Sequence, residues 1–151
     1  MESRQQLTHW QSRVHLVHEP SLECLYSRYI VELSLGVYSL CDLPPSKLSA
    51  AALALSMRLL DPASNLETVW NNNLVHYTKY TLEEIRPTVE RLATVLINAP
   101  SAKLATVYQK YSNKKFMKIA RFVIYSSLLL MTALYRKSNL EFQTSNSHSM
   151  L

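Results

Sequence analysis

The sequence contains a single glycine, Gly36, among 151 residues. Folds built from strands and tight turns rely on glycine for backbone positions with positive φ. Its scarcity therefore favours an all-α bundle of helices. The G-x-G-x-x-G and P-loop motifs both need more than one glycine and are excluded. We expect no enzyme activity, no cofactor and no small-molecule substrate.

Cysteine is also scarce, since the chain has only Cys24 and Cys41. If the two residues bracket one helix, a rise of ~1.5 Å per residue separates them by about 25 Å, far beyond disulfide reach. Free thiols and a polar start without a signal peptide indicate a reducing compartment, hence the nucleus and cytoplasm. His15 and His18 with Cys24 lack the fourth ligand of a zinc site, so no metal is expected.

Long hydrophobic runs are missing except for residues 122–135, which are mostly apolar. A membrane-spanning helix needs about 20 residues, so this run favours an extra, sixth helix over 121–136, with a tail anchor in a membrane as the alternative. Residues 1–20 are polar and predict a flexible arm. Residues 137–151 are expected to be a disordered tail. Residues 21–120 remain as a single domain.

Acidic residues are absent between positions 103 and 121, and this gap accounts for much of the net charge of +5. A solvated helix face is the plainest interpretation. Acidic partner proteins or nucleic acid are the partners that such a face would attract. The basic residues are Lys103, Lys110, Lys114, Lys115, Lys118 and Arg121.

Five segments between residues 22 and 111 show apolar residues at steps of three and four, the spacing of an amphipathic helix. The first runs from Leu22 to Leu40 and stops at two prolines. The second, Lys47–Leu60 with Ser46 as its cap, is small or apolar nearly all round, which predicts a central helix. The other expected helices cover 66–77, 82 to just before Pro100, and about 102–111.

The start of the fourth segment has its own signature. Thr81 and Glu84 form a capping box, in which each side chain accepts a hydrogen bond from the other residue's backbone. Pro87 is expected to remove one backbone hydrogen bond and bend the first turns. We also expect Trp70, Tyr77 and Tyr80 to wedge the third helix against the fourth.

Several segments, taken in order, resemble the second box of the B-type mitotic cyclins, in the cyclin B or cyclin B3 branch. The opening RYIVELSL at 28–35 resembles the family pattern [RK]-Y-x-x-E-L-[ST]. Residues 45–52 are similar to the second-helix entry, residues 70–80 to the third-helix motif, and residues 110–120 to the fifth-helix exit. The family-motif and core residues are Tyr29, Leu33, Trp70, Leu74, Tyr77, Tyr80, Tyr111 and Phe116.

The resemblance implies a single five-helix cyclin-box bundle whose partner is a cyclin-dependent protein kinase, and a role in cell-cycle control. In such cyclins a first box carries most of the kinase contact and the M-R-A-I-L docking motif, and neither is found here. In the third-helix motif, Asn72 also stands where the family usually has proline. We therefore expect an isolated or truncated second box that binds a kinase weakly and does not activate it alone.

Two alternatives to kinase regulation stay open. A cyclin-like box in a transcription factor could contact nucleic acid through the basic segment 103–121, and residues 122–135 could anchor the protein in a membrane. Both are less favoured than the kinase partner. The arm also holds two R-x-x-L sequences, at 4–7 and 13–16, which resemble cyclin degradation signals but are short enough to occur by chance.

Overall fold

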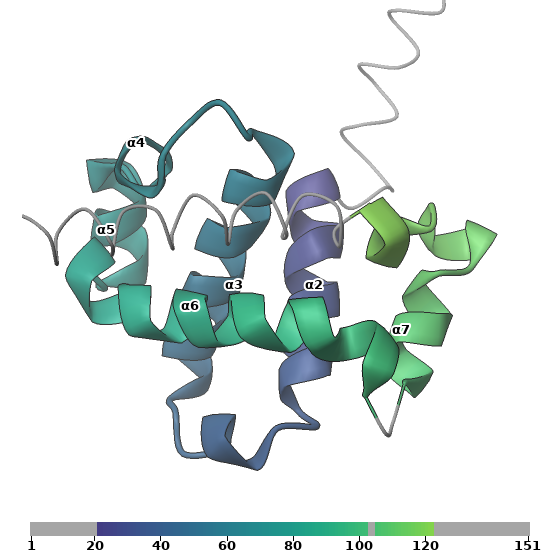
Figure 1. Ribbon diagram of the computed structural model, residues 1–151. Coiled ribbons are helices and arrows are strands. Elements are labelled where there is room, and N and C mark those ends of the chain that lie inside the picture. Colours follow the sequence, from purple (N-terminus) through teal and green to yellow (C-terminus); the bar gives the residue numbers. More distant parts are fainter. Residues whose placement is uncertain (1–20, 103–104, 123–151) are drawn as a thin grey trace, which may run out of the picture.

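The computed structural model describes residues 21–102 and 105–122. Every regular element within these ranges is helical, so the all-α prediction is confirmed (Figure 1). The α-helices are α2 (Leu22–Ser34), α3 (Pro45–Leu60), α4 (Leu66–Val69), α5 (Asn72–Thr78), α6 (Leu82–Asn98) and α7 (Thr106–Tyr111). Three 3-10 turns accompany them: η1 (Tyr38–Leu40), η2 (Ala99–Ser101) and η3 (Lys114–Phe116). The expected arm over 1–20 and the disordered tail over 137–151 lie outside the described residues, as does all but the start of the extra helix over 121–136.

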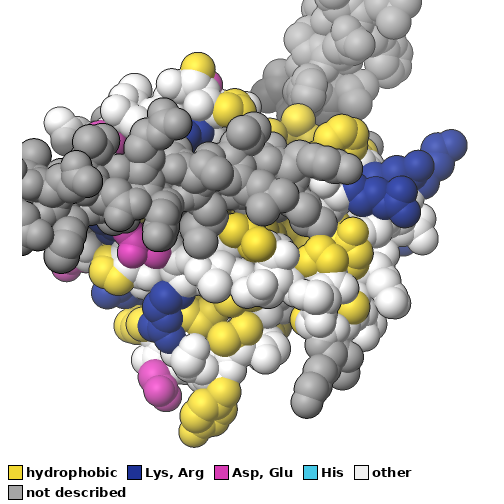
Figure 2. All heavy atoms as spheres, in the orientation of Figure 1, with side chains coloured by type: hydrophobic (Ala, Val, Ile, Leu, Met, Phe, Trp, Pro, Cys, Tyr) yellow, Lys and Arg dark blue, Asp and Glu magenta, His cyan; other side chains and the backbone are white. Residues whose placement is uncertain are grey.

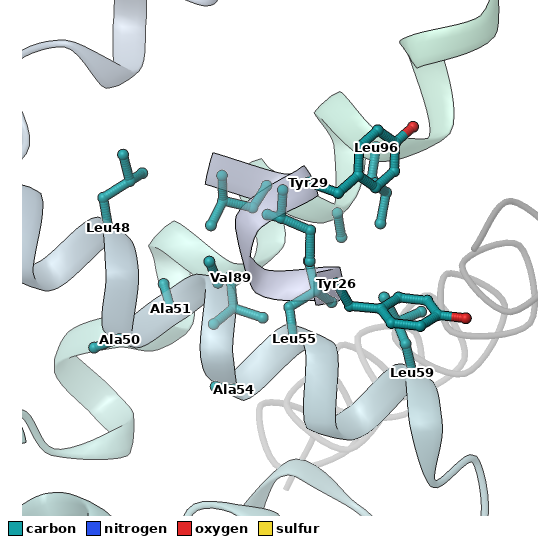
Figure 3. Close-up of a cluster of buried hydrophobic side chains, with 14 of the residues drawn as sticks. Tyr26, Tyr29, Leu48, Ala50, Ala51, Ala54, Leu55, Leu59, Val89 and Leu96 are labelled. Carbon is teal, nitrogen blue, oxygen red and sulfur yellow. The ribbon is translucent and has the colours of Figure 1, made fainter. Parts of the chain in front are cut away.

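Helix α3 occupies the centre of the bundle, between α2 and α6 (Figure 1). Ala51, Ala54 and Leu55 on α3 have no exposed surface. The close-up shows side chains of α3 beside Tyr26 of α2 and Val89 of α6 (Figure 3). Because alanine has a small side chain, neighbouring helices can approach α3 closely. The prediction of a central, alanine-rich helix is confirmed.

Helix α2 is shorter than the expected Leu22–Leu40 and ends at Ser34. The chain turns after it, and η1 brings Leu40 into the core with 2% of its surface exposed. Apolar steps of three are compatible with both an α-helix and a 3-10 turn, so the spacing alone concealed the break. A single helix between Cys24 and Cys41 was therefore wrong, although both thiols are free and exposed.

Ser46 does not cap α3, contrary to the expectation. The helix begins at Pro45, two residues before the expected start at Lys47, and its N-cap residue is Pro44. Proline suits a first helical position because its missing N–H would have no partner there. The hydroxyl of Ser46 instead lies 2.8 Å from the hydroxyl of Tyr80. This hydrogen bond links the start of α3 to the segment before α6.

The expected third helix over 66–77 is broken into α4 and α5 at Trp70 and Asn71. The side chain of Asn71 accepts a hydrogen bond from the backbone N–H of Leu74 at 3.1 Å, and Asn65 caps α4 in the same way. An asparagine with this geometry starts a helix. The single-helix expectation overlooked Asn71 as a second start signal.

The capping box of α6 is confirmed. The N–H of Glu84 donates to the Thr81 hydroxyl at 3.4 Å, and the N–H of Thr81 donates to the Glu84 carboxylate at 2.7 Å. Pro87 lies inside α6, which ends at Asn98, just before Pro100 as expected. The fifth predicted helix is shorter than expected, because α7 begins at Thr106 and residues 103–104 are outside the described part.

Candidate protein-interaction surface

A charged contact joins the end of α2 to α7. The ammonium of Lys110 donates to both carboxylate oxygens of Glu32, at 3.0 and 2.8 Å. The hydroxyl of Tyr111 donates to Oε1 of the same carboxylate at 2.8 Å. Because an ionised carboxylate accepts such bonds more strongly than a neutral one, these three groups hold α7 against α2.

The pKa of Glu32 follows from this contact. Partial burial by itself opposes the charged form, but the hydrogen bonds from Lys110 and Tyr111 outweigh it, so the pKa lies below the ordinary value. Burial, reinforced by the neighbouring Glu32 carboxylate, raises the pKa of the Tyr111 hydroxyl. Glu32 therefore stays charged and Tyr111 stays a hydrogen-bond donor at neutral pH.

An aromatic stack continues the contact from α2 through α7 to η3. The ring centroids of Tyr29 and Tyr111 are 4.9 Å apart, and those of Tyr111 and Phe116 are 4.7 Å apart. The ammonium of Lys110 lies 5.1 Å from the Tyr111 ring centroid and 5.5 Å from that of Phe116. Such distances permit cation–π attraction. The stack therefore positions η3 next to Lys110.

An open groove of about 830 Å³ lies between the end of α2, the end of α6 and the start of α7. Apolar side chains make up much of its wall, and Glu32 with Lys110 stands on its rim. Its volume falls in the usual range of binding pockets, about 300–1,000 Å³. The apolar lining residues are Leu33, Leu35, Val37, Val95, Ala99, Ala102 and Val107.

Five of the six basic residues singled out in the sequence lie in the described part, and all five are exposed: Lys110, Lys114, Lys115, Lys118 and Arg121. Lys103 is outside it. Basic side chains stand out beside apolar ones at the edge of the molecule where α7 leads into η3 (Figure 2). Residues 105–122 contain no acidic side chain. This end of the bundle therefore combines an apolar groove with a positive rim.

The structure separates the family-motif residues by depth. Tyr29, Trp70 and Tyr111 are buried, whereas Leu33, Leu74, Tyr80 and Phe116 are half-buried against the core. The indole of Trp70 donates to the Tyr80 carbonyl at 3.1 Å, which joins α4 to the start of α6.

The expectation of a core role for Tyr77 was wrong, because 83% of its surface is exposed. The break at Trp70 and Asn71 is the cause. In a continuous helix, Trp70 and Tyr77 would share a face after two turns. Since a new helix starts at Asn72, this relation is lost, and Trp70 is buried whereas Tyr77 is exposed. Tyr77 instead contacts the exposed His76, whose ring centroid is 5.5 Å away.

The described residues contain neither a candidate metal site nor a helix that could span a membrane. No three histidine, cysteine, aspartate or glutamate side chains within 21–102 and 105–122 gather as a metal site would require. None of the helices in the same ranges has the length and apolar character needed to cross a bilayer. His15, His18 and the apolar run after Phe122 lie outside the residues that the structure describes.

Sequence reasoning singled out Lys110 but missed its partner Glu32 and the groove beside them. Glu32 and Lys110 each stand in a motif quoted for the family resemblance, one near the start of the domain and one near its end. Opposite charges in two such motifs were the available signal. The groove had no comparable signal, because Leu35 and Val107 look like ordinary helix-face residues.

Comparisons with known proteins agree with this architecture. Residues 7–125 match the family described as the cyclin C-terminal domain. The chain is 39% identical over 104 residues to the G2/mitotic-specific cyclin-B of Spisula solidissima and 38% identical over 105 residues to that of Marthasterias glacialis. It is also 37% identical over 110 residues to Cyclin-A1-1 of Arabidopsis thaliana.

These alignments cover 69%, 70% and 71% of the chain but 23%, 26% and 23% of the respective relatives. The chain thus spans about a quarter of the length of the curated relatives it matches. The matched domain includes all of the described helices. The chain therefore belongs to the cyclin family, and it carries a C-terminal cyclin box of the B-type mitotic class.

Proposed function

We propose that this chain is a non-catalytic interaction module that binds a cyclin-dependent protein kinase and takes part in the control of mitosis. The observation that carries the proposal is the match of residues 7–125 to the cyclin C-terminal domain. The relatives in Spisula and Marthasterias are named as G2/mitotic-specific cyclins. A kinase that resides in the nucleus and cytoplasm would place this chain in the same compartments.

The second part of the proposal is that the 151-residue chain does not activate the kinase by itself. The family resemblance assigns most of the kinase contact to a first box, and the chain aligns to about a quarter of each relative. A smaller contact area leaves less free energy to hold the kinase in its active conformation, because a ligand shifts an equilibrium only by its differential affinity. Binding without activation is the expected combination.

Binding is tested with purified chain and a purified mitotic cyclin-dependent kinase in biolayer interferometry. We expect weak, saturable binding that a whole cyclin B displaces. Whole cyclin B alone serves as the positive control, and a chain unfolded by Leu55→Asp serves as the negative control, since Leu55 is fully buried. Absence of binding at the highest soluble concentration of folded chain contradicts the proposal.

Nucleic-acid binding is the second candidate, and the exposed basic residues between Lys110 and Arg121 favour it. Contacts to phosphate release counterions, so such binding must weaken steeply as salt rises. A mobility-shift series with duplex DNA from low to physiological salt distinguishes the candidates. Retardation that disappears as the salt concentration rises supports this function. DNA that migrates without retardation even at low salt eliminates it.

A further inference from the structure

The groove between α2, α6 and α7 contains apolar side chains that the core leaves uncovered. Leu35, directly after α2, has 73% of its surface exposed although it borders the groove. Val95 and Val107 line the opposite walls and are half-buried. A single exposed leucine is ordinary. A leucine at the mouth of a concave apolar site offers a place to bury the apolar side chain of a partner.

Positive charge lies next to one side of this groove. Lys110 lines the groove, and its ammonium is 5.5 Å from the ring centroid of Phe116, the last residue of η3. The exposed Lys114 and Lys115 belong to the same short turn as Phe116. Among the described residues that line the groove, Glu32 is the acidic one, and Lys110 already neutralises it. The two charged residues of the lining thus balance each other, and Lys114 and Lys115 supply the positive charge beside the groove.

We propose that this surface docks a short partner segment that inserts apolar side chains into the groove and places acidic side chains against Lys114 and Lys115. Opposite charge guides such a segment to the site and fixes its direction. The groove gives it affinity through apolar burial. This inference goes beyond the proposed function, because it needs no kinase and concerns a different class of ligand.

Charge also decides between this occupant and the apolar run of the chain itself. Residues 122–135 are flanked by Arg121 on one side and by Arg136 and Lys137 on the other. These flanks have the same sign as Lys114 and Lys115, so the basic rim repels them. A second copy of the chain would likewise bring its own basic rim toward this one. An acidic segment is the complementary occupant.

The test uses the full chain and a fluorescein-labelled synthetic peptide with two leucines and a phenylalanine followed by a run of glutamates. Fluorescence anisotropy measures its Kd, and a peptide with lysines in place of the glutamates is the matched probe. The groove variant is Leu35→Gln and the charge variant is Lys114→Gln with Lys115→Gln. Tyr77→Gln and Lys79→Asn, on and beside α5, are the corresponding controls, and circular dichroism verifies that each variant is folded.

We expect the acidic peptide to bind and the lysine peptide to bind much more weakly. Leu35→Gln should raise the Kd about fivefold to tenfold, because it removes an apolar contact at the mouth of the groove. Loss of two surface charges should raise the Kd about twofold to tenfold and reduce its salt dependence. The two control variants should leave the Kd unchanged.

Five results overturn the inference. Three concern the peptides: no binding of the acidic peptide, equal binding of both peptides, and equal Kd values for Leu35→Gln and Tyr77→Gln. The fourth is binding that appears only after Leu128→Asp and Leu130→Asp, since the chain's own apolar run would then occupy the groove. The fifth is a dimer in analytical ultracentrifugation that Leu35→Gln converts to a monomer, since a second copy would then be the occupant.

Discussion

Glu32 connects distant parts of the chain, and no sequence pattern indicated this role. Its carboxylate accepts hydrogen bonds from Lys110 and Tyr111, which are 78 and 79 residues away along the chain. An interaction of such sequence separation fixes how two helices meet rather than how either one forms. The aromatic stack of Tyr29, Tyr111 and Phe116 then packs behind it. One ionised side chain thus orients the wall of the groove.

Replacing Glu32 with glutamine tests this role at the residue scale. The substitution keeps the shape but removes the charge, so the bonds from Lys110 and Tyr111 weaken. We expect the free energy of unfolding to fall by about 1–2 kcal/mol, below the full value of charged hydrogen bonds because Lys110 is partly exposed. Urea denaturation measures the change. Glu90→Gln, at an exposed carboxylate on α6, is the control and should change stability by less than about 0.5 kcal/mol.

The low pKa of Glu32 predicts a pH dependence of stability. Because the folded pKa lies below the ordinary value of 4.5, the unfolded state binds its proton first as pH falls. The contribution of Glu32 is complete above pH 4.5 and is lost as pH drops through the folded pKa. The stability difference between the unmodified chain and Glu32→Gln should therefore be constant near neutrality and shrink in acid. A difference that grows in acid contradicts the assignment.

At the scale of single residues, the sequence identified the aromatic and basic positions but not their pairings. Tyr29 and Tyr111 were both singled out, yet their stacking distance depends on how α2 meets α7. Tyr77 was misplaced because a helical face can be assigned only when the helix is continuous. Glu32 was quoted as part of a motif without a role. These pairings depend on tertiary contacts, which the periodicity of the sequence does not encode.

Among the elements, α3 carries the packing of the whole bundle. Ala51 has no exposed surface and lies where α2 and α6 approach α3. A larger side chain there has no room, so Ala51→Leu should lower the free energy of unfolding by about 1–3 kcal/mol. Ser49→Leu adds a similar side chain on the exposed face of the same helix and should have little effect. Denaturant unfolding measures the stability of both variants. Equal stabilities of Ala51→Leu and Ser49→Leu contradict the central position of α3.

The break between α4 and α5 makes a second prediction at this scale. Trp70 is buried with 4% exposure and donates a hydrogen bond to the Tyr80 carbonyl, whereas Tyr77 points into solvent. Trp70→Ala should therefore cost about 3–5 kcal/mol, the usual price of removing a buried indole. Tyr77→Ala should change stability by less than about 0.5 kcal/mol. Thermal unfolding measures the stability of both variants. A large loss of stability for Tyr77→Ala would mean that α4 and α5 form one helix after all.

Helix α6 could be predicted from the sequence because the capping box at Thr81 marks its start and its apolar face is regular. The central position of α3 could also be predicted, since the segment is small or apolar nearly all round, but its start was misplaced because Ser46 resembles a cap residue. The end of α2 at Ser34 could not be predicted, since Val37 and Leu40 continue the apolar spacing through a 3-10 turn. Asn71 was a readable start signal that the aromatic pattern around it overshadowed.

At the scale of the whole molecule, the described helices build a C-terminal cyclin box with a groove and a basic rim at one end. The side of the bundle that carries α4 and α5 lies away from this groove (Figure 1). Two partners could therefore bind at separate places. The groove variants Leu35→Gln and Lys114→Gln with Lys115→Gln thus leave kinase binding unchanged if the kinase uses another face. Biolayer interferometry of these variants with the kinase measures this, and a parallel loss of both ligands shows that one surface serves both.

Binding of a kinase without its activation is tested by the rate at which a purified cyclin-dependent kinase phosphorylates a substrate. The rate is recorded with the kinase alone, with saturating purified chain, and with whole cyclin B. We expect the chain to leave the rate at the level of the kinase alone, at concentrations where interferometry shows it bound. A rate close to that obtained with whole cyclin B would mean that this chain activates the kinase without a first box.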